Sequence, residues 1–397
     1  MRICVFTDSF LPYISGVSSA ALNQANEMAA RGHDVSIFHP RAKKEDRLDS
    51  VPGLHPGIRA YGLPLSLPVA GVPKLRFAVP LFLFTYGRLK QADPDIIHVH
   101  SEFGCGLEGM FLGHWKDVPV VGTFHTFFAE PEYLKQFHIP NFSFTRKAMW
   151  QYSVSFFNRC VRVVSPSRSV RDNLRQRGLK RPAVLMSNGI DRIEMRSPEA
   201  IRDFRHSMGI DGFAFIYIGR VSPEKSLEIV LRSFGRVVRR HPKVKFVLVG
   251  NGPADEAVDR QIEELGLTGS VIRTGRIERD TLMRENYPLL GDAFVTASKT
   301  ENQPVSLLEA MAFGLPMIGP RAKGIPELVR DGEDGIIFEP DDVDALARSM
   351  ERLIDEPELR ESMSAAALRN ATEHRIDKIG EQLEGIYRES IEAFAGA

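Results

Sequence analysis

The chain has 397 residues, which is enough for two domains that each bury a core. Its apolar residues (43%) and charged residues (26%) occur in the proportions of an ordinary soluble protein, which excludes a disordered or fibrous chain. No apolar run approaches the ~20 residues of a membrane-spanning helix, and the apolar run at residues 2–6 meets Asp8 too soon for a signal peptide. Cys4, Cys105 and Cys160 are widely separated, which predicts core thiols in a reducing compartment and hence a cytoplasmic protein.

The formal net charge is zero, but the charges are unevenly distributed. Residues 1–188 carry 23 Lys and Arg against 14 Asp and Glu, whereas residues 189–376 carry 26 against 32 and residues 377–397 carry 2 against 5. A basic N-terminal half on a neutral chain indicates an anionic partner for that half, either a membrane surface or a nucleic acid.

The first half of the sequence alternates short apolar runs with amphipathic stretches, a pattern that predicts a parallel sheet flanked by helices. Helices are predicted at residues 18–31, 107–114 and 167–177. Strands are predicted at residues 2–7, 35–38, 96–99, 118–122, 161–164 and 184–186.

After a linker at Ser187–Asp191 the alternation begins again. Strands are predicted at 213–218, 245–249, 270–274 and 293–296, with helices at 226–240, 254–265 and 279–287. We therefore expect an α/β protein with two Rossmann-like, doubly wound domains, 1–188 and 189–376, and a last helix (377–394) that packs back on the first domain. Ligands bind at the carboxyl ends of strands in such sheets, so two facing domains predict a cleft.

Two carboxylates, Glu301 and Glu309, flank the start of a further predicted helix, which begins near Pro304 and stops at Gly314. The unpaired N–H groups of a helix start form an anion-binding arrangement. The alternative is an ordinary solvated helix face, the usual place for charged residues.

A second candidate site is the segment Gly219–Lys225, GRVSPEK, which joins a predicted strand to a predicted helix. Arg220 and Lys225 place two cations close to that helix start, an arrangement that favours phosphate. A solvated surface loop is the alternative. The later turn Gly250-Asn-Gly is no dinucleotide fingerprint, because Asp255 stands at the third glycine position, and the Walker pattern is absent from the sequence.

In the first domain, Gly16 is expected in the loop after the first strand, where a glycine lets backbone N–H groups approach a ligand, or simply makes a turn. His125 ends a predicted strand at the ligand-binding edge of the sheet, although a lone histidine is more often structural. His98 and His100 share one strand face, and we interpret them as packing residues because two ligands make a poor metal site.

Two Asp-x-Asp patterns raise the possibility of a metal-bound sugar diphosphate. The first, Asp93 with Asp95, precedes a strand in a turn, and the second, Asp342 with Asp344, opens a helix, where Asp caps are common. Neither stands at the carboxyl end of a strand, so we expect no metal.

Two segments combine basic and aromatic residues, which suits an anionic lipid surface or single-stranded nucleic acid, although part of this enrichment must be core. Residues 61–90 have no acidic residue, five aromatics and four cations, namely Lys74, Arg76, Arg88 and Lys90. Residues 131–160 have one acidic residue, four cations and eight aromatics, namely Tyr133, Phe137, Phe142, Phe144, Trp150, Tyr152, Phe156 and Phe157.

With these motifs the chain resembles retaining glycosyltransferases of family 4, which have two Rossmann-like domains around a cleft (the GT-B fold). The resemblance extends over nearly the whole chain and rests on the glycine at position 16, on Gly219–Lys225 and on the Glu-x7-Glu element from Glu301 to Glu309. It implies that Arg220 and Lys225 bind the diphosphate of a nucleotide sugar and stabilise it as the leaving group. Retention of configuration is likewise implied by the resemblance.

The same resemblance assigns further roles. Glu309 is expected to bind the ribose hydroxyls and Glu301 the sugar hydroxyls, with help from the backbone of the helix start at Asn302, Gln303, Pro304 and Val305. Gly16 is expected near the diphosphate, His125 beside the anomeric carbon and the acceptor, and the turn at Arg276 and Ile277 at the base. Family members commonly have a glycine soon after the first Glu, and Asn302-Gln303-Pro304 departs from that pattern, which leaves the sugar open.

The segments Leu67–Pro80 and Gly122–Thr126 resemble those of bacterial glycolipid synthases, which transfer glucose or a related sugar to diacylglycerol, or mannose to an anionic lipid. We therefore expect a hexosyltransferase that uses a UDP-sugar and a lipid acceptor at the inner face of the cell membrane, with no cofactor and no nucleic-acid partner. A GDP-mannose enzyme acting on phosphatidylinositol or a glucuronosyl lipid is the alternative within this class. A nucleotide-sugar epimerase and a binding protein without chemistry are alternatives from other classes.

Overall fold

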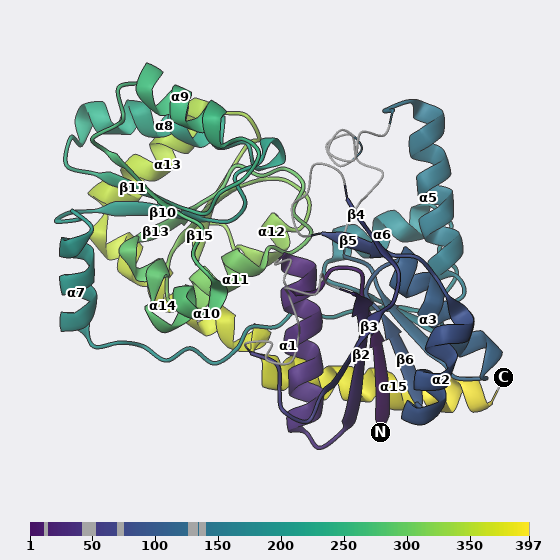
Figure 1. The fold of residues 1–397 in the computed structure, drawn as a ribbon. Helices are drawn as coiled ribbons and strands as arrows, with labels where there is room; N and C mark the ends of the chain where they lie inside the picture. The colour runs from purple at the N-terminus through teal and green to yellow at the C-terminus, as the bar shows by residue number, and fades with distance from the viewer. Residues whose placement is uncertain (12–14, 42–52, 70–74, 126–133, 135–139, 397) are drawn as a thin grey trace. The chain divides into compact units, whose positions relative to one another are not determined.

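The computed structural model describes residues 1–11, 15–41, 53–69, 75–125, 134 and 140–396 (Figure 1). The chain forms two compact units, residues 1–189 with 376–397 and residues 190–375. The long C-terminal helix α15 (Ile376–Ala395) belongs to the first unit, where it packs against α1 (Gly16–Ala30). The chain thus leaves the first unit after Gly189 and returns to it at Ile376.

The first unit is built on a parallel sheet with the strand order β3-β2-β1-β6-β7-β8-β9. The order runs outward in both directions from β1 and β6, which makes their boundary a topological switch point. Edge strand β3 was not predicted, because its residues are mostly half-exposed and do not form an apolar run. The strands are β1 (Arg2–Phe6), β2 (Asp34–Pro40), β3 (Arg59–Leu63), β6 (Ile96–Val99), β7 (Val120–Thr123), β8 (Arg162–Ser165) and β9 (Ala183–Leu185).

The helices predicted for this unit begin within three residues of where the sequence places them, and two further helices, residues 82–92 and 143–157, were not predicted. Helix α1 starts at Gly16, so Gly16 is its first residue and not a loop residue. The reason is a capping box: the Ser15 hydroxyl accepts from Ser18 N at 3.2 Å, and Ser15 N donates to Ser18 Oγ at 2.7 Å. The other elements are α2 (Phe82–Ala92), α3 (Gly104–Trp115), α5 (Ser143–Phe157), α6 (Arg168–Gln176) and an antiparallel pair, β4 (Ser66–Pro68) with β5 (Arg76–Ala78).

The second unit repeats this architecture with the parallel order β12-β11-β10-β13-β14-β15. Its switch point lies between β10 (Ala214–Ile218) and β13 (Ala293–Val295). The remaining strands are β11 (Lys245–Val249), β12 (Val271–Gly275), β14 (Met317–Pro320) and β15 (Gly335–Phe338). The helices are α7 (Pro198–Ser207), α8 (Leu227–Arg240), α9 (Asp255–Glu264), α10 (Arg279–Arg284), α11 (Val305–Ala312), α12 (Ile325–Leu328), α13 (Val343–Asp355) and α14 (Pro357–Ala371).

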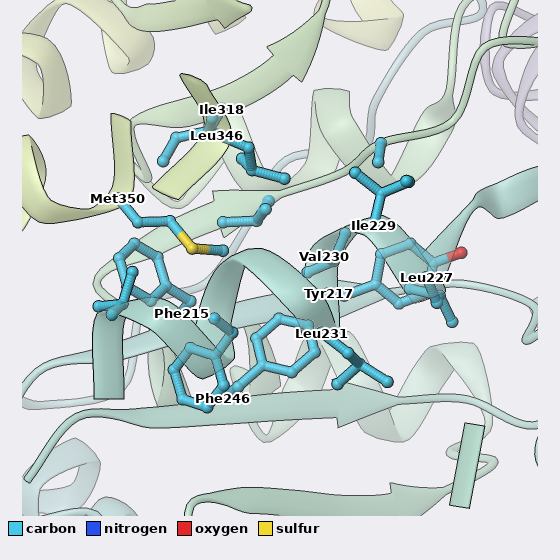
Figure 2. Close-up of a cluster of buried hydrophobic side chains, with 14 of the residues drawn as sticks. Phe215, Tyr217, Leu227, Ile229, Val230, Leu231, Phe246, Ile318, Leu346 and Met350 are labelled. Atoms are coloured by element: carbon cyan, nitrogen blue, oxygen red, sulfur yellow. The ribbon is translucent and has the colours of Figure 1, made fainter. Parts of the chain in front are cut away.

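A large apolar cluster holds this second sheet against α8 and α13 (Figure 2). Phe215 and Phe246 of the sheet, Leu231 of α8 and Met350 of α13 are all fully buried within it. Ser233 of α8 donates to a backbone oxygen of α13, that of Val343, at 2.9 Å. The strands therefore hold the loops that follow β10 and β13 on a rigid base.

The expectation about the three cysteines is met. Cys4, Cys105 and Cys160 are free and buried, as predicted. Among the helices that the structure describes, none has the length and apolar composition needed to cross a membrane.

Candidate functional site

In the second unit, the loop after β10 is ordered by its own polar side chains. Arg220 donates from Nη2 to Glu224 Oε1 at 2.5 Å, and Ser222 Oγ donates to the same oxygen at 2.6 Å. Burial works to raise the pKa of Glu224, but the charges of Arg220 and Lys225 and the Ser222 hydrogen bond outweigh it and lower that pKa. Tyr217 in β10 donates to Arg220 O at 3.0 Å. The Arg220 cation is thus fixed at the carboxyl end of the strand.

The loop after β13 meets this first loop. Lys225 Nζ forms an ion pair with Glu301 Oε1, and Ser298 Oγ donates to Glu224 O at 3.3 Å. Lys225 and Glu301 keep less than a fifth of their side-chain surface exposed. The structure therefore brings together two predicted site residues that are 76 positions apart in the sequence.

Glycines let these loops pack closely. Gly250 has φ of +134°, and a Cβ there would stand 1.9 Å from Gly219 O, so the turn after β11 lies directly on the loop after β10. Gly324 N donates to Glu301 O at 3.0 Å, and a Cβ on Gly324 would stand 1.7 Å from Asn302 O. The Glu301–Asn302 backbone is consequently held against the turn that precedes α12.

Helix α11 carries the second carboxylate inward. Pro304 stands at its N-cap position with φ of −71°, and Val305 and Leu308 are buried. Glu309 is only 6% exposed, so the solvated-face alternative is wrong for this residue. Burial raises the pKa of Glu309, and the charge of Arg279, whose Nε donates to Glu309 Oε1 at 2.9 Å, opposes that rise.

Two residues of this region were not predicted. The terminal nitrogens of Arg279 lie 3.3 Å from Asp191 Oδ2, so Arg279 bridges Glu309 and Asp191. The three residues come from α10, α11 and the linker segment, and Arg279 and Asp191 are 88 positions apart, so no local spacing connects them. The predicted neighbours Gln303 and Ile277 are half-buried, and Ile277 packs against the apolar cluster that holds Leu308.

In the first unit, Asp8 follows β1 at the other switch point and was also missed. It is fully buried and accepts hydrogen bonds from Ala78 N (3.1 Å), Cys105 N (3.0 Å) and Ser101 Oγ (2.6 Å). Burial raises the pKa of Asp8, while these hydrogen bonds oppose the rise. The carboxyl group ties β5 and the start of α3 to the end of β1.

The histidines gather at the same edge. His125 Nε2 lies 2.9 Å from His100 Nδ1, so His100 contacts the predicted site residue and does more than pack. His98 does pack as predicted, with its ring nitrogens 2.7 Å from the Tyr387 hydroxyl and 2.6 Å from Thr123 Oγ1. Burial lowers the pKa of His125 to about 4 and that of His98 to about 3, and burial also lowers the pKa of His100 well below its usual value. These rings are neutral at pH 7.

A buried carboxyl group, Glu102, completes this edge. Ser153 Oγ donates to Glu102 Oε1 at 2.9 Å, and Tyr152 donates to the Glu102 backbone oxygen. Burial raises the pKa of Glu102 to about 7. The two contacts attach helix α5 to the segment after β6.

Asp342 has the capping role predicted for it, and Asp93 and Asp95 have an ion-pair partner that was not predicted. Arg2 forms ion pairs with both Asp93 and Asp95. Asp342 caps α13 by accepting from Ala345 N at 2.8 Å. Within the residues that the structure describes, no group of three or more His, Cys, Asp and Glu side chains is placed to hold a metal ion.

The aromatic segments divide between core and surface. Trp150, Phe156 and Phe157 of α5 are buried, so they are core residues, whereas Phe142 and Phe144 at its start are 68% and 80% exposed. Tyr133, Phe137 and Lys74 lie outside the described residues.

A second exposed group lies on α2 and α3 and is called the α2–α3 aromatic surface below. The ring centroids of Phe82 and Phe111 are 4.1 Å apart, and those of Tyr86 and Trp115 are 4.7 Å apart. Phe111 and Trp115 are close to half exposed. Lys116 lies over the Tyr86 ring, 4.9 Å from its centroid.

Comparisons with known proteins agree with this two-part architecture. Residues 14–193 match the model of the family described as Glycosyltransferase Family 4, and residues 202–370 match that described as Glycosyl transferases group 1. An alpha-monoglucosyldiacylglycerol synthase of Streptococcus pneumoniae is 29% identical, over 98% of this chain and 86% of that protein. A GDP-mannose-dependent alpha-mannosyltransferase of Corynebacterium glutamicum is 27% identical, over 92% of this chain and 84% of that protein.

Among solved structures, Anabaena HepE in complex with UDP-glucose has a similar fold. Its TM-score is 0.79 at 20% sequence identity, and the match covers 98% of this chain and 99% of HepE. The predicted pair of Rossmann-like sheets is thus confirmed as the GT-B fold.

Proposed function

We propose that this protein moves a hexosyl group from a UDP-glucose-type donor to a membrane lipid such as diacylglycerol. The chain belongs to the glycosyltransferases that join a family 4 domain to a group 1 domain, and it is a hexosyltransferase. The anomeric configuration is retained, and the reaction needs no metal. The observation that carries the proposal is the Lys225–Glu301 ion pair, which joins the loops after β10 and β13 at the switch point, with Arg220 held in the first of these loops by Glu224.

The donor is bound by the second unit in this proposal. Negative charge grows on the diphosphate as the sugar–phosphate bond breaks, so preorganised cations and the N–H groups at the start of α11 lower the barrier. Glu301 binds sugar hydroxyls, and Glu309 binds the ribose. The leaving phosphate takes the proton of the acceptor hydroxyl on the same face of the sugar. Glu301, which is paired with Lys225, is a hydroxyl ligand and not a nucleophile.

The first unit binds the acceptor. Its edge offers the neutral ring of His125 and buried, hydrogen-bonded carboxyl groups, which suits an uncharged hydroxyl better than a phosphate. Phe111 and Trp115 of the α2–α3 aromatic surface are exposed, as are Phe142 and Phe144 at the start of α5, and neither α2 nor α5 contains an acidic residue. Exposed rings beside cations fit an anionic lipid surface, so we place the enzyme at the inner face of the cell membrane.

A GDP-mannose donor is the second candidate, because relatives over nearly the whole chain are named GDP-mannose-dependent alpha-mannosyltransferases. The purified enzyme should be incubated with labelled UDP-glucose or GDP-mannose and vesicles that contain diacylglycerol, phosphatidylinositol or a glucuronosyl lipid, followed by separation of lipid products. A labelled glucolipid supports the first donor, and a labelled mannolipid the second. If neither donor labels any of these lipids, the lipid-glycosylation proposal is wrong. NMR of each donor alone would reveal epimerisation.

Membrane docking is tested by flotation with vesicles that contain or lack anionic lipid. We expect binding to need anionic lipid, to weaken with salt, and to fall when Phe111 and Trp115 are changed to serine. Leu265→Ser in the second unit is the matched control, since Leu265 is 39% exposed. Binding that ignores lipid charge and salt would contradict docking.

A further inference from the structure

The second unit contains one arginine that contacts a predicted donor-site carboxylate without having been assigned to the site. Arg279 opens α10, and its Nε donates to Glu309 Oε1 at 2.9 Å. Its two terminal nitrogens both reach Asp191 Oδ2 at 3.3 Å. Asp191 lies two residues after Gly189, where the chain enters the second unit.

This cluster differs from a solvated surface pair. The side chain of Arg279 is 20% exposed and that of Glu309 only 7%. Burial works to lower the pKa of Arg279, but Glu309 and Asp191 outweigh it, so the guanidinium keeps its charge. Burial raises the pKa of Glu309 and the charge of Arg279 lowers it, so a Glu309 that has lost this cation takes up a proton more readily.

We propose that Arg279 is a positioning residue of the donor site, which holds Glu309 in one orientation as a carboxylate and thereby sets its grip on the ribose. This inference rests on the proposed function, because it needs Glu309 to face the nucleotide. Arg279 Nε occupies Oε1, so Oε2 is the carboxylate oxygen directed to a ribose hydroxyl. Asp191 completes the bridge by holding the opposite side of the guanidinium.

The chain offers a matched control for this arginine. Arg273 in β12 also bridges two carboxylates, those of Asp255 and Asp259, with a side chain 22% exposed. Neither carboxylate belongs to the proposed site. Arg273→Ala therefore removes the same kind of ion-pair bridge from the same unit without touching Glu309.

The test measures UDP and GDP binding to the full chain by calorimetry, with 2′-deoxy-UDP and 2′-deoxy-GDP as probes of the ribose contact. We expect Arg279→Ala to raise the Kd of whichever diphosphate binds by about 10-fold or more, since one charge-assisted contact is lost. The preference for the ribo over the 2′-deoxy nucleotide should fall toward one. Arg279→Lys should restore part of both, and Asp191→Asn should give a smaller change in the same direction.

A second readout separates positioning from a general loss of structure. Arg279 and Asp191 are the charged groups that act on the pKa of Glu309, and without Arg279 that pKa rises. Nucleotide binding by Arg279→Ala should therefore weaken more than wild-type binding does as the pH falls from 8 to 6. Arg273→Ala should follow the wild type in Kd, in 2′-deoxy discrimination and in pH dependence.

The outcomes are distinguishable. If neither diphosphate binds the wild type, the proposed donor site itself is wrong. If the wild type binds but Arg279→Ala and Arg279→Lys match Arg273→Ala in all three readouts, the positioning role is wrong. If Arg279→Ala fails to fold, the same readouts on Arg279→Lys and Asp191→Asn test the positioning role.

Discussion

The two sheets of this molecule share one architecture, yet the residues near the carboxyl ends of their strands differ in charge. In the second unit, the proposed donor site holds formed ion pairs: Lys225 with Glu301 and Arg279 with Glu309. In the first unit, the corresponding edge holds neutral histidines and buried carboxyl groups such as Asp8, whose pKa is raised by burial. The difference shows that this fold fixes where a ligand binds and leaves the charge of the site to the loops.

That contrast matches the two substrates of the proposed reaction. A nucleotide diphosphate is a strong anion that gains charge as its bond to the sugar breaks, so it needs cations already in place. A lipid hydroxyl is neutral until it reacts, and a site of low charge accepts it without a desolvation penalty for an unpaired ion. The predictions below test each side of the comparison.

The largest expected effect concerns the ion-paired donor site proposed in the second unit. Lys225→Ala and Glu309→Ala should each lower kcat/KM for the donor at least ~100-fold, equivalent to about 2.7 kcal/mol of lost transition-state stabilisation. Lys245→Ala, a change in β11 where Lys245 bonds Gly269 O, should stay near the wild-type rate. Steady-state kinetics with the productive donor give the result, and near-wild-type rates for both site variants would refute the donor-site assignment.

Buried Glu102 in the first unit should give the protein an unusual dependence of stability on pH. The pKa of Glu102 is about 7 in the folded protein against an ordinary value of 4.5, so folding favours the protonated form. The wild type therefore loses stability as the pH rises from about 4.5 to about 7, by up to about 3 kcal/mol. Glu102→Gln removes this loss.

Urea unfolding of wild type and Glu102→Gln at pH 5 and pH 8 measures that effect. We expect the two proteins to differ little at pH 5 and the variant to be the more stable at pH 8. The opposite order at pH 8 would show that the Glu102 carboxylate is stabilised in the folded unit.

A smaller effect is expected from the buried bond between Tyr387 and His98. Tyr387→Phe leaves a ring nitrogen of His98 buried without that partner, which should cost about 1–2 kcal/mol in the free energy of unfolding. Tyr387→Leu should cost more, because it also leaves a cavity. Unchanged stability of the Phe variant would mean that water replaces the hydroxyl.

The smallest expected change is the pH response of His125. With a pKa of about 4, its ring is about 1% protonated at pH 6, so its protonation should leave kcat/KM almost constant between pH 8 and pH 6. NMR titration of the ring, assigned with His125→Gln, measures this directly. A midpoint near 6.5 would show that the edge of the first unit is open to water.

Much of the fold was predictable, because most strands of the buried parallel sheets are short apolar runs in the sequence. β6 and β11 have the predicted bounds, whereas half-exposed β3 lacked an apolar signal. In the site, Lys225 and Glu301 were recognisable because each stands in a local motif.

The residues that the sequence did not reveal contact partners that lie far away along the sequence. Asp8 receives hydrogen bonds from residues 70 and 97 positions away, and Arg279 reaches a carboxylate 88 positions back. Such long-range contacts leave no periodic pattern in a single sequence. His100 was visible but was interpreted as packing, because its partner His125 follows the neighbouring strand β7 and comes 25 positions later.

The return of the chain to its first unit has a consequence for protein synthesis. Tyr387 and Leu383 of α15 are buried in that unit, so its core stays open until the C-terminal segment has been made. At ribosomal rates, residues 190–397 take roughly 10–40 s to appear, and the continuous second unit has been made in full before α15 is added. The half of the enzyme that is translated first is therefore finished last, and chains that terminate early would leave the ribosome with an exposed apolar groove.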